Sequence, residues 1–211
     1  MLKGIDISHH NYNMVSHEAL NTLDFVIMKA TEGIKFRDPK MINYISFLNP
    51  FKIRGFYHFA RPDLGNAPEA EAYHFIKTIS RYINGRTIIA LDVEAEALKV
   101  KDIDAWVCVW CQVVEMETGV RPLIYCSAAE GKRFKGAADL GCGLWVAKWS
   151  DKKPTEKQIK PWPFWAIWQY TSDGVFSGVR VDLDYFNGTE DQFLKYAEVK
   201  HERSDTDDTR D

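Results

Sequence analysis

Two carboxylates separated by one residue, Asp92 and Glu94, stand at the end of an apolar run in this chain of 211 residues. The run Thr87–Val93 has the length and the β-branched content of a buried strand. Because alternate side chains of a strand share a face, both carboxylates project to the same side, with Cα atoms about 6.6–7 Å apart. Like charges at this spacing oppose joint ionisation, so one carboxyl should keep its proton to higher pH. A general acid that protonates a glycosidic oxygen needs such a proton, and Glu94, which lies nearer the strand end, is assigned this role.

The shared face of Asp92 and Glu94 also limits what the pair can do. Glycosidases with two catalytic carboxylates place them on either side of the scissile bond, which two groups on one strand face do not achieve. The second partner must therefore come from elsewhere, either from Asp6, from Asp182 or from the substrate. In the last case a 2-acetamido oxygen attacks the anomeric carbon, and Asp92 orients the amide and stabilises positive charge.

Acidic residues recur at the ends of the predicted strands. A single Asp-x-Glu pair is a weak signal, because such pairs also occur at solvated strand edges. The cluster becomes informative through its four members, which are Asp6, Asp92, Glu94 and Asp182. A divalent metal is the competing use of such a cluster, and three histidines could add ligands: His9, His10 and His58. No metal-binding spacing stands out, so the pattern favours a glycosidase, and neither a metal nor another cofactor is expected.

Eight short apolar runs predict the strands that position these acids. They are Gly4–Ile7, Phe25–Ala30, Ile53–Phe59, Thr87–Val93, Pro122–Cys126, Leu144–Trp149, Phe164–Tyr170 and Val179–Tyr185. Helical patterns separate the first several, over Pro39–Phe47, Pro68–Ile83, Asp102–Thr118 and Ala128–Ala138. This alternation predicts a parallel sheet and an α/β barrel related to the (β/α)₈ type, whose functional residues gather at the carboxyl ends of the strands. The later strands leave little room for helices, so an irregular closure with some antiparallel pairing is expected.

Composition narrows the class of protein. Hydrophobic residues make up 45% and charged residues 27% of the chain, as in ordinary globular proteins. A net charge of −3 and the absence of a basic stripe argue against a nucleic-acid partner. No apolar stretch approaches the ~20 residues of a membrane helix, and the first residues lack the pattern of a signal peptide. Residues 1–198 are expected to form one catalytic domain and the charged residues 199–211 a disordered tail.

Several conspicuous residues have structural interpretations. Cys108 and Cys111 have C-x-x-C spacing, but they lie within a predicted helix without matching ligands, so packed free thiols are favoured over a metal site. His58 is expected to be a hydrogen-bonded structural histidine. Lys29 and Glu32 are expected to pair with each other.

The chain resembles glycoside hydrolase family 25, the Chalaropsis-type muramidases, many of which are bacteriophage endolysins. Eight stretches carry the resemblance, in the family's order and over nearly the whole chain to about residue 195. They are Gly4–Asn11, Asp24–Gly33, Gly55–Pro62, Leu91–Glu94, Thr118–Tyr125, Leu144–Trp149, Trp168–Ser172 and Val181–Phe186. Many relatives carry wall-binding repeats after the catalytic domain, whereas this chain shows none.

The resemblance implies a flattened, irregular barrel of five strand–helix units followed by about three further strands. It implies hydrolysis of the β-1,4 bond between N-acetylmuramic acid and N-acetylglucosamine in peptidoglycan. The family's acid falls on Glu94, its assisting carboxylate on Asp92 and its further groove acids on Asp6 and Asp182. Five more residues are expected to bind the sugars: Tyr57, Tyr125, Trp149, Gln169 and Asp184.

Two other functions remain open from the sequence alone. A sugar-binding protein without turnover would keep the aromatic groove, although it would not need the acids. A barrel glycosidase for chitin-like polymers would also use closely spaced acids and substrate assistance. The expected partner is a peptidoglycan strand bound by a monomer, without nucleic acid or membrane, and the expected route is synthesis in the cytoplasm, with holin-type release to the wall if a phage encodes the protein.

Overall fold

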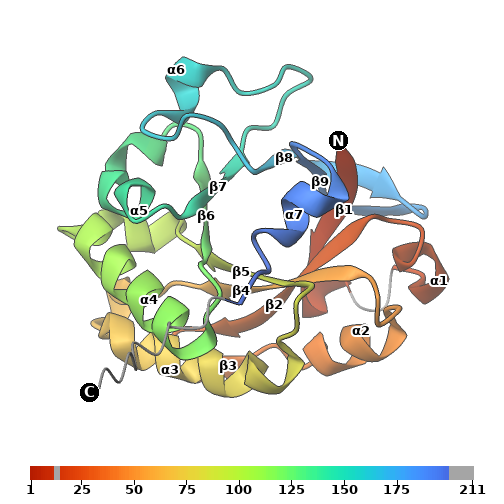
Figure 1. Cartoon of the computed structure of the whole chain (residues 1–211), viewed down its shortest axis with the longest axis horizontal. Helices are drawn as coiled ribbons and strands as arrows, with labels where there is room; N and C mark the ends of the chain where they lie inside the picture. Colours follow the sequence, from red (N-terminus) through yellow and green to blue (C-terminus); the bar gives the residue numbers. More distant parts are fainter. Residues whose placement is uncertain (12–14, 200–211) are drawn as a thin grey trace, which may run out of the picture.

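The computed structural model describes residues 1–11 and 15–199, and these form an α/β barrel (Figure 1). Its wall is a sheet in the order β1-β9-β8-β7-β6-β5-β4-β2, closed by pairing between β1 and β2, with the two-residue strand β3 added beside β2. The strands are β1 Leu2–Ile7, β2 Phe25–Glu32, β3 Phe36–Arg37, β4 Ile53–Phe59, β5 Thr87–Asp92, β6 Leu123–Ser127, β7 Gly143–Ala147, β8 Ile167–Phe176 and β9 Val179–Phe186. The expected barrel is thereby confirmed.

The strand pairing is parallel from β1 through β2, β4, β5, β6 and β7 to β8. The last strand, β9, runs antiparallel to both β8 and β1. The irregular, partly antiparallel closure is therefore present. The finer division into five strand–helix units and three closing strands is not confirmed, because a short helix separates β7 from β8 and β8 still continues the parallel order.

Most helices cover the outside of the barrel, whereas the last one lies across its end (Figure 1). They are α1 His17–Leu20, α2 Met41–Phe47, α3 Pro68–Ile79, α4 Ile103–Thr118, α5 Lys135–Asp139, α6 Glu156–Ile159 and α7 Glu190–Leu194. The expected helix over Ala128–Ala138 is wrong in its first half, where a turn and the 3₁₀ segment Gly131–Arg133 precede α5. The backbone N–H groups of Gly136 and Ala137 bond the Asp104 carboxylate, so the helix begins where a side chain from α4 caps it.

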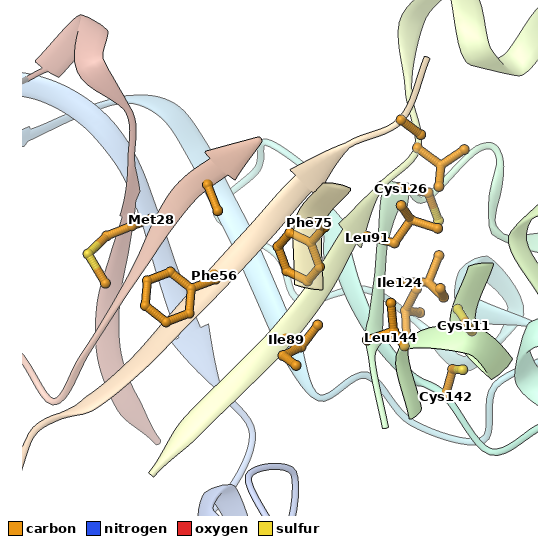
Figure 2. Packing of buried hydrophobic residues seen from close by; sticks show 14 of the residues in the cluster. Met28, Phe56, Phe75, Ile89, Leu91, Cys111, Ile124, Cys126, Cys142 and Leu144 are labelled. Atoms are coloured by element: carbon orange, nitrogen blue, oxygen red, sulfur yellow. The ribbon is translucent and has the colours of Figure 1, made fainter. Parts of the chain in front are cut away.

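Alternation along the strands creates two apolar layers. In β5, Ile88 and Ala90 belong to the inner cluster, which fills the barrel, whereas Ile89 and Leu91 belong to the outer cluster beneath the helices. Figure 2 shows part of the outer cluster, in which Cys111 of α4 lies near strand residues such as Ile124. The four cysteines are free, as expected, and three of them are buried. Phe193 of α7 stacks on Phe186 and closes the amino-terminal end of the barrel.

Inside the barrel the strands pack too closely for larger side chains at some positions. A Cβ atom at Gly55 of β4 would lie 2.7 Å from Ile88 Cγ1 and 3.1 Å from Ile27 Cγ1. A Cβ atom at Gly4 of β1 would lie 2.3 Å from the nearest ring carbon of Phe25. Because this lower half is filled with side chains, only the upper half, at the carboxyl ends of the strands, has room for a ligand.

Candidate active site

A cavity of about 290 Å³ opens at the carboxyl ends of the barrel strands. It contains all four predicted acids, Asp6, Asp92, Glu94 and Asp182. It also contains four of the five predicted sugar-binding residues, Tyr57, Tyr125, Trp149 and Gln169. Strand alternation explains the convergence, since Asp6, Tyr57, Asp92 and Tyr125 have the same inward parity as the filled positions below them.

Backbone pairing on both sides holds Asp92 and Glu94 in place. The Ala60 N–H donates to the Asp92 carbonyl at 3.0 Å, and the Val93 N–H donates to the Tyr125 carbonyl at 3.0 Å. Glu94 follows in extended backbone, directly before the 3₁₀ segment Ala95–Lys99. The sheet order therefore continues one residue beyond β5, and both carboxylates face the cavity, as the sequence predicts.

The protonation of this pair is set mainly by burial. Asp92 is buried, and among the described residues no partner bonds its Oδ1. Burial raises the pKa of Asp92 well above its usual value, and the charges of Glu94 and Asp6 raise it further. Burial also raises the pKa of the half-buried Glu94, while the positive charge of Lys29 opposes that rise. Both groups thus hold a proton more readily than a solvated carboxyl does.

Three further carboxyls face each other across strands β1 and β9. Asp6 lies directly opposite Asp182 in the ladder and shares hydrogen bonds with both Asp182 and Asp184. Burial is the largest cause of a raised pKa at all three, followed at Asp6 by the charge of Asp184 and at Asp182 by the charge of Asp6. The pKa of Asp182 rises to about 8 and that of Asp184 to about 7. A hydrogen bond between two carboxyls requires a proton on one of them, so this group is partly protonated at neutral pH.

Asp184 lies beneath the cavity and is not among its lining residues. Its side chain is 1% exposed, with Oδ1 accepting a hydrogen bond from Trp145 Nε1 at 2.8 Å. The predicted contact between Asp184 and sugar stays a prediction. In this position Asp184 contacts Asp6 and supports it from below.

Gln169 of β8 connects three of the lining residues. Its Nε2 donates to Asp6 Oδ2 at 2.8 Å. Its Oε1 accepts from Tyr125 Oη at 2.9 Å and from Trp149 Nε1 at 3.0 Å. The buried amide thereby ties an acid, a groove tyrosine and a tryptophan that is 65% exposed into one network.

Five residues that line the cavity were not assigned to the site from the sequence: Ser8, His10, Lys29, Phe59 and Trp145. Lys29 Nζ lies 2.7 Å from Glu32 Oε2, which confirms the expected pair, and 4.6 Å from the centre of the Phe59 ring. The positive charge of Lys29 also lowers the pKa values of Glu94 and Asp92, which opposes the effect of burial. Alternation was the available signal, because Lys29 shares the inward parity of Ile27, and Trp145 lies between two residues of the outer cluster.

His58 has the structural role expected for it. It is buried, with Nδ1 2.7 Å from Thr31 Oγ1 and Nε2 2.7 Å from Glu71 Oε2. Among the residues that the structure describes, no group of three or more His, Cys, Asp or Glu side chains is arranged to hold a metal ion. Nor is any helix of residues 1–11 and 15–199 long and apolar enough to cross a membrane.

Comparison with known proteins places this geometry in context. A family model described as "Glycosyl hydrolases family 25" matches residues 5–179. Lysozyme M1 of Streptomyces globisporus is 29% identical over 93% of this chain and 71% of its own length. The uncharacterised protein YegX of Escherichia coli O157:H7 is 29% identical over 83% of this chain, and the match spans 64% of YegX. The crystal structure of the bacterial lysozyme from Streptomyces coelicolor superposes with a TM-score of 0.78 at 26% identity, covering 93% of this chain and 96% of that one.

Proposed function

The chain belongs to family 25 of the glycosyl hydrolases, and on this premise we propose that it is a muramidase of bacterial peptidoglycan. The bond cleaved is the β-1,4 linkage between N-acetylmuramic acid and N-acetylglucosamine. The names of lysozyme M1 and of the superposed Streptomyces coelicolor lysozyme support this substrate. The proposed site of action is the bacterial cell wall.

One observation carries the proposal, namely the cluster of raised-pKa carboxyls in an open cavity at the carboxyl ends of the strands. Glu94 is only half-buried and has a raised pKa, so it combines access to substrate with a retained proton. In the proposed reaction Glu94 gives this proton to the glycosidic oxygen as the bond to the anomeric carbon breaks. The resulting Glu94 carboxylate later takes a proton from the water that attacks the anomeric carbon.

The opposite side of the reaction is assigned to the substrate. The 2-acetamido oxygen attacks the anomeric carbon, and a cyclic intermediate forms that water then opens. Asp92 supports this step, because its carboxyl lines the cavity and can accept a hydrogen bond from the acetamido N–H. Asp6 and Asp182 lie on the far wall, on β1 and β9, and would activate the water if the acetamido group does not participate.

The substitution Glu94→Gln tests the proposal. The amide keeps the shape of Glu94 but has no acidic proton to give, so clearing of a purified peptidoglycan suspension should slow by about a hundredfold or more. Glu96→Gln is the matched control, since Glu96 lies two residues away, is exposed and pairs only with Lys99 in the structure. Clearing by the Glu94→Gln variant at the wild-type rate would refute the role of Glu94.

The products identify the bond. Hydrolysis by a muramidase leaves N-acetylmuramic acid at the new reducing ends, so borohydride should reduce muramic acid to its sugar alcohol. Reduced glucosamine ends would refute muramidase action. Faster hydrolysis of chitin oligomers than of peptidoglycan would instead indicate a chitin-directed glycosidase. Binding of glycan fragments without any products after long incubation would indicate a sugar-binding protein.

A further inference from the structure

A second hollow lies beside the acidic cavity, over the carboxyl ends of β2 and β4. It has a volume of about 360 Å³, within the range of about 300–1,000 Å³ typical of small-molecule sites. Residues following β2 and β4 line it, including Ile34, Phe36, Arg61, Leu64 and Asn66. We propose that this hollow binds a further N-acetylated amino sugar of the same glycan strand whose bond is cut at Glu94, an inference that rests on the proposed function.

The walls of the hollow are held in place before any ligand arrives. Arg61 Nη1 bonds Glu32 Oε1 at 2.8 Å, which joins the β4 wall to the β2 wall. Asn66 Nδ2 donates to Arg61 O at 3.1 Å and to Glu71 Oε1 at 2.8 Å. Trp106 Nε1 of α4 donates to Asn66 O at 2.9 Å. A site with fixed walls loses little conformational entropy on binding.

The close approach of the two walls depends on a glycine. Gly33 has φ +54°, and its N–H donates to the Phe59 carbonyl at 3.2 Å. A Cβ atom at Gly33 would lie 3.3 Å from Asn66 Nδ2 and 3.4 Å from Arg61 Cβ. The left-handed backbone and the tight contact both favour glycine, so the floor of the hollow is specified by sequence.

The hollow presents apolar side chains to solvent. Leu64 is 63%, Ile34 40% and Phe36 37% exposed. Three such side chains around one depression are unusual, because large exposed apolar residues are normally scattered singly. The C–H faces of a pyranose ring and the methyl of an acetamido group are apolar, and they would cover this surface.

Two of the three charged residues that line the hollow, Glu32 and Arg61, are paired within the protein. Arg61 is paired with both Glu32 and Asp63, so its guanidinium offers little net attraction to an anion. Asn66 donates both of its side-chain hydrogen bonds from Nδ2, so its Oδ1 can accept from an acetamido N–H or a sugar hydroxyl. An N-acetylglucosamine unit matches the apolar side chains and the Asn66 amide, whereas a phosphate polymer or an acidic peptide would be attracted mainly by the exposed Lys35 at the same hollow.

Lys29 lies between the hollow and the acidic cavity. Lys29 and Phe59 line the cavity, whereas Phe36 and Glu32 line the hollow. Lys29 Nζ bonds Glu32 and lies 5.6 Å from the centre of the Phe36 ring and 4.6 Å from that of Phe59. In the proposed complex a strand of linked sugars fills the cavity, where it contacts Trp149, and passes over Lys29 to reach the adjacent hollow.

The test compares glycan chains of different length. The double variant Ile34→Ser/Leu64→Ser removes apolar contact without touching the residues of the acidic cavity. Its KM for long peptidoglycan oligosaccharides should rise by about five- to tenfold with kcat unchanged, while KM for the shortest cleavable oligosaccharide stays at the wild-type value. In a Glu94→Gln background, the dissociation constant of a long oligosaccharide, measured by titration calorimetry, should rise by the same factor.

Met116→Ser is the matched control, since Met116 is an equally exposed apolar residue on α4 and lines neither depression. A double variant that keeps the wild-type dependence on chain length would overturn the subsite while leaving the muramidase proposal intact. An equal loss on short and long chains would also overturn it, because the substitutions would then act on the cavity or on folding. A wild-type protein that cleaves no length would overturn the proposed function and the subsite with it.

Discussion

At the scale of single residues, Gln169 decides the arrangement of the site more than its neutral side chain suggests. One amide satisfies Asp6, Tyr125 and Trp149 together, and its orientation is fixed because Nε2 must donate and Oε1 must accept. The carboxyls nearby supply the chemistry, whereas this amide fixes where Asp6 and Trp149 stand. Gln169 is therefore expected to be a positioning residue for the reaction as well as a sugar contact.

Replacing Gln169 with Leu should lower both activity and stability. Leu keeps a similar volume but leaves the Tyr125 hydroxyl and one Asp6 oxygen without their partner, at a cost of about 1–3 kcal/mol for each buried group. We expect kcat/KM on peptidoglycan to fall by about tenfold to a hundredfold, together with a loss of unfolding free energy in urea. The control is Gln112→Leu on the exposed side of α4. Unchanged kcat/KM in the Gln169 variant would show that the network does not position the site.

The carboxyl beneath the cavity, Asp184, offers a second test at this scale. Asp184→Asn keeps an oxygen for Trp145 Nε1 but removes the charge that raises the pKa of Asp6. Titration of Asp6 in the free enzyme should then shift to lower pH, which carbon-detected NMR of the carboxyl groups can follow. Any limb of the pH profile of kcat/KM that reports Asp6 should shift in the same direction. If Asp184 were only a packing residue, the substitution would change stability without moving the Asp6 titration.

At the scale of elements, a buried hydrogen-bond network around the Glu71 carboxylate fixes α3 and the loop after β4. Glu71 is fully buried on α3 and accepts from the Arg61 N–H at 3.0 Å and from Asn66 Nδ2, with His58 Nε2 at 2.7 Å. Burial lowers the pKa of His58, so the ring tends to be neutral and to donate one N–H to Glu71. The same carboxylate therefore supports both the barrel wall and the hollow.

Removal of this carboxylate should be costly. Glu71→Ala leaves several buried donors without an acceptor, and we expect a loss of about 3–5 kcal/mol in unfolding free energy, measured by urea denaturation. Glu71→Gln retains one oxygen and should lose less. Glu69→Ala, on the exposed side of the first turn of α3, should change little. A loss below about 1 kcal/mol in Glu71→Ala would contradict the network's structural importance.

Sequence patterns predict the faces of the strands better than the starts of the helices or the contacts between distant residues. Strand alternation correctly predicts which side chains face the cavity, because the period of two leaves no other choice once the apolar face is known. The helix over Ala128–Ala138 is mispredicted at its start, since its cap comes from Asp104, a tertiary contact that local spacing does not contain. The hollow and the Gln169 network each join residues that are far apart in the chain. The periodicity of a single strand or helix does not predict such contacts. For Lys29 the sequence predicted only a pairing with Glu32, although its parity already indicated an inward position.

At the scale of the whole molecule, the carboxyl cluster is a source of instability that depends on pH. Asp182 and Asp184 have pKa values of about 8 and 7 in the folded chain, far above those of the unfolded chain. The folded state therefore binds more protons than the unfolded state at intermediate pH, so unfolding free energy decreases as pH rises. The stability associated with these protonated carboxyls is fully present below about pH 4. It is lost progressively up to about pH 8, where the carboxyls are ionised in both the folded and the unfolded chain. Asp6 and Asp92, whose pKa values are also raised, act in the same direction.

The pH dependence of the unfolding free energy should change when one carboxyl of the cluster is removed. Each group that is protonated only in the folded state contributes a slope of at most about 1.4 kcal/mol per pH unit, so urea denaturation between pH 4 and pH 8 should show a clear decline in stability. Asp184→Asn should reduce the slope and make the variant less destabilised than wild type at pH 8, because the neutral amide has no charge to desolvate. Asp173→Asn, an exposed position on β8 that pairs with Arg180, is the control and should leave the slope unchanged. If wild-type stability instead rises steadily from pH 4 to pH 8, the carboxyls do not share protons in the folded state. Such a rise would contradict the inference that the buried carboxyls, which include the proposed acid, lower the unfolding free energy when they lose their protons.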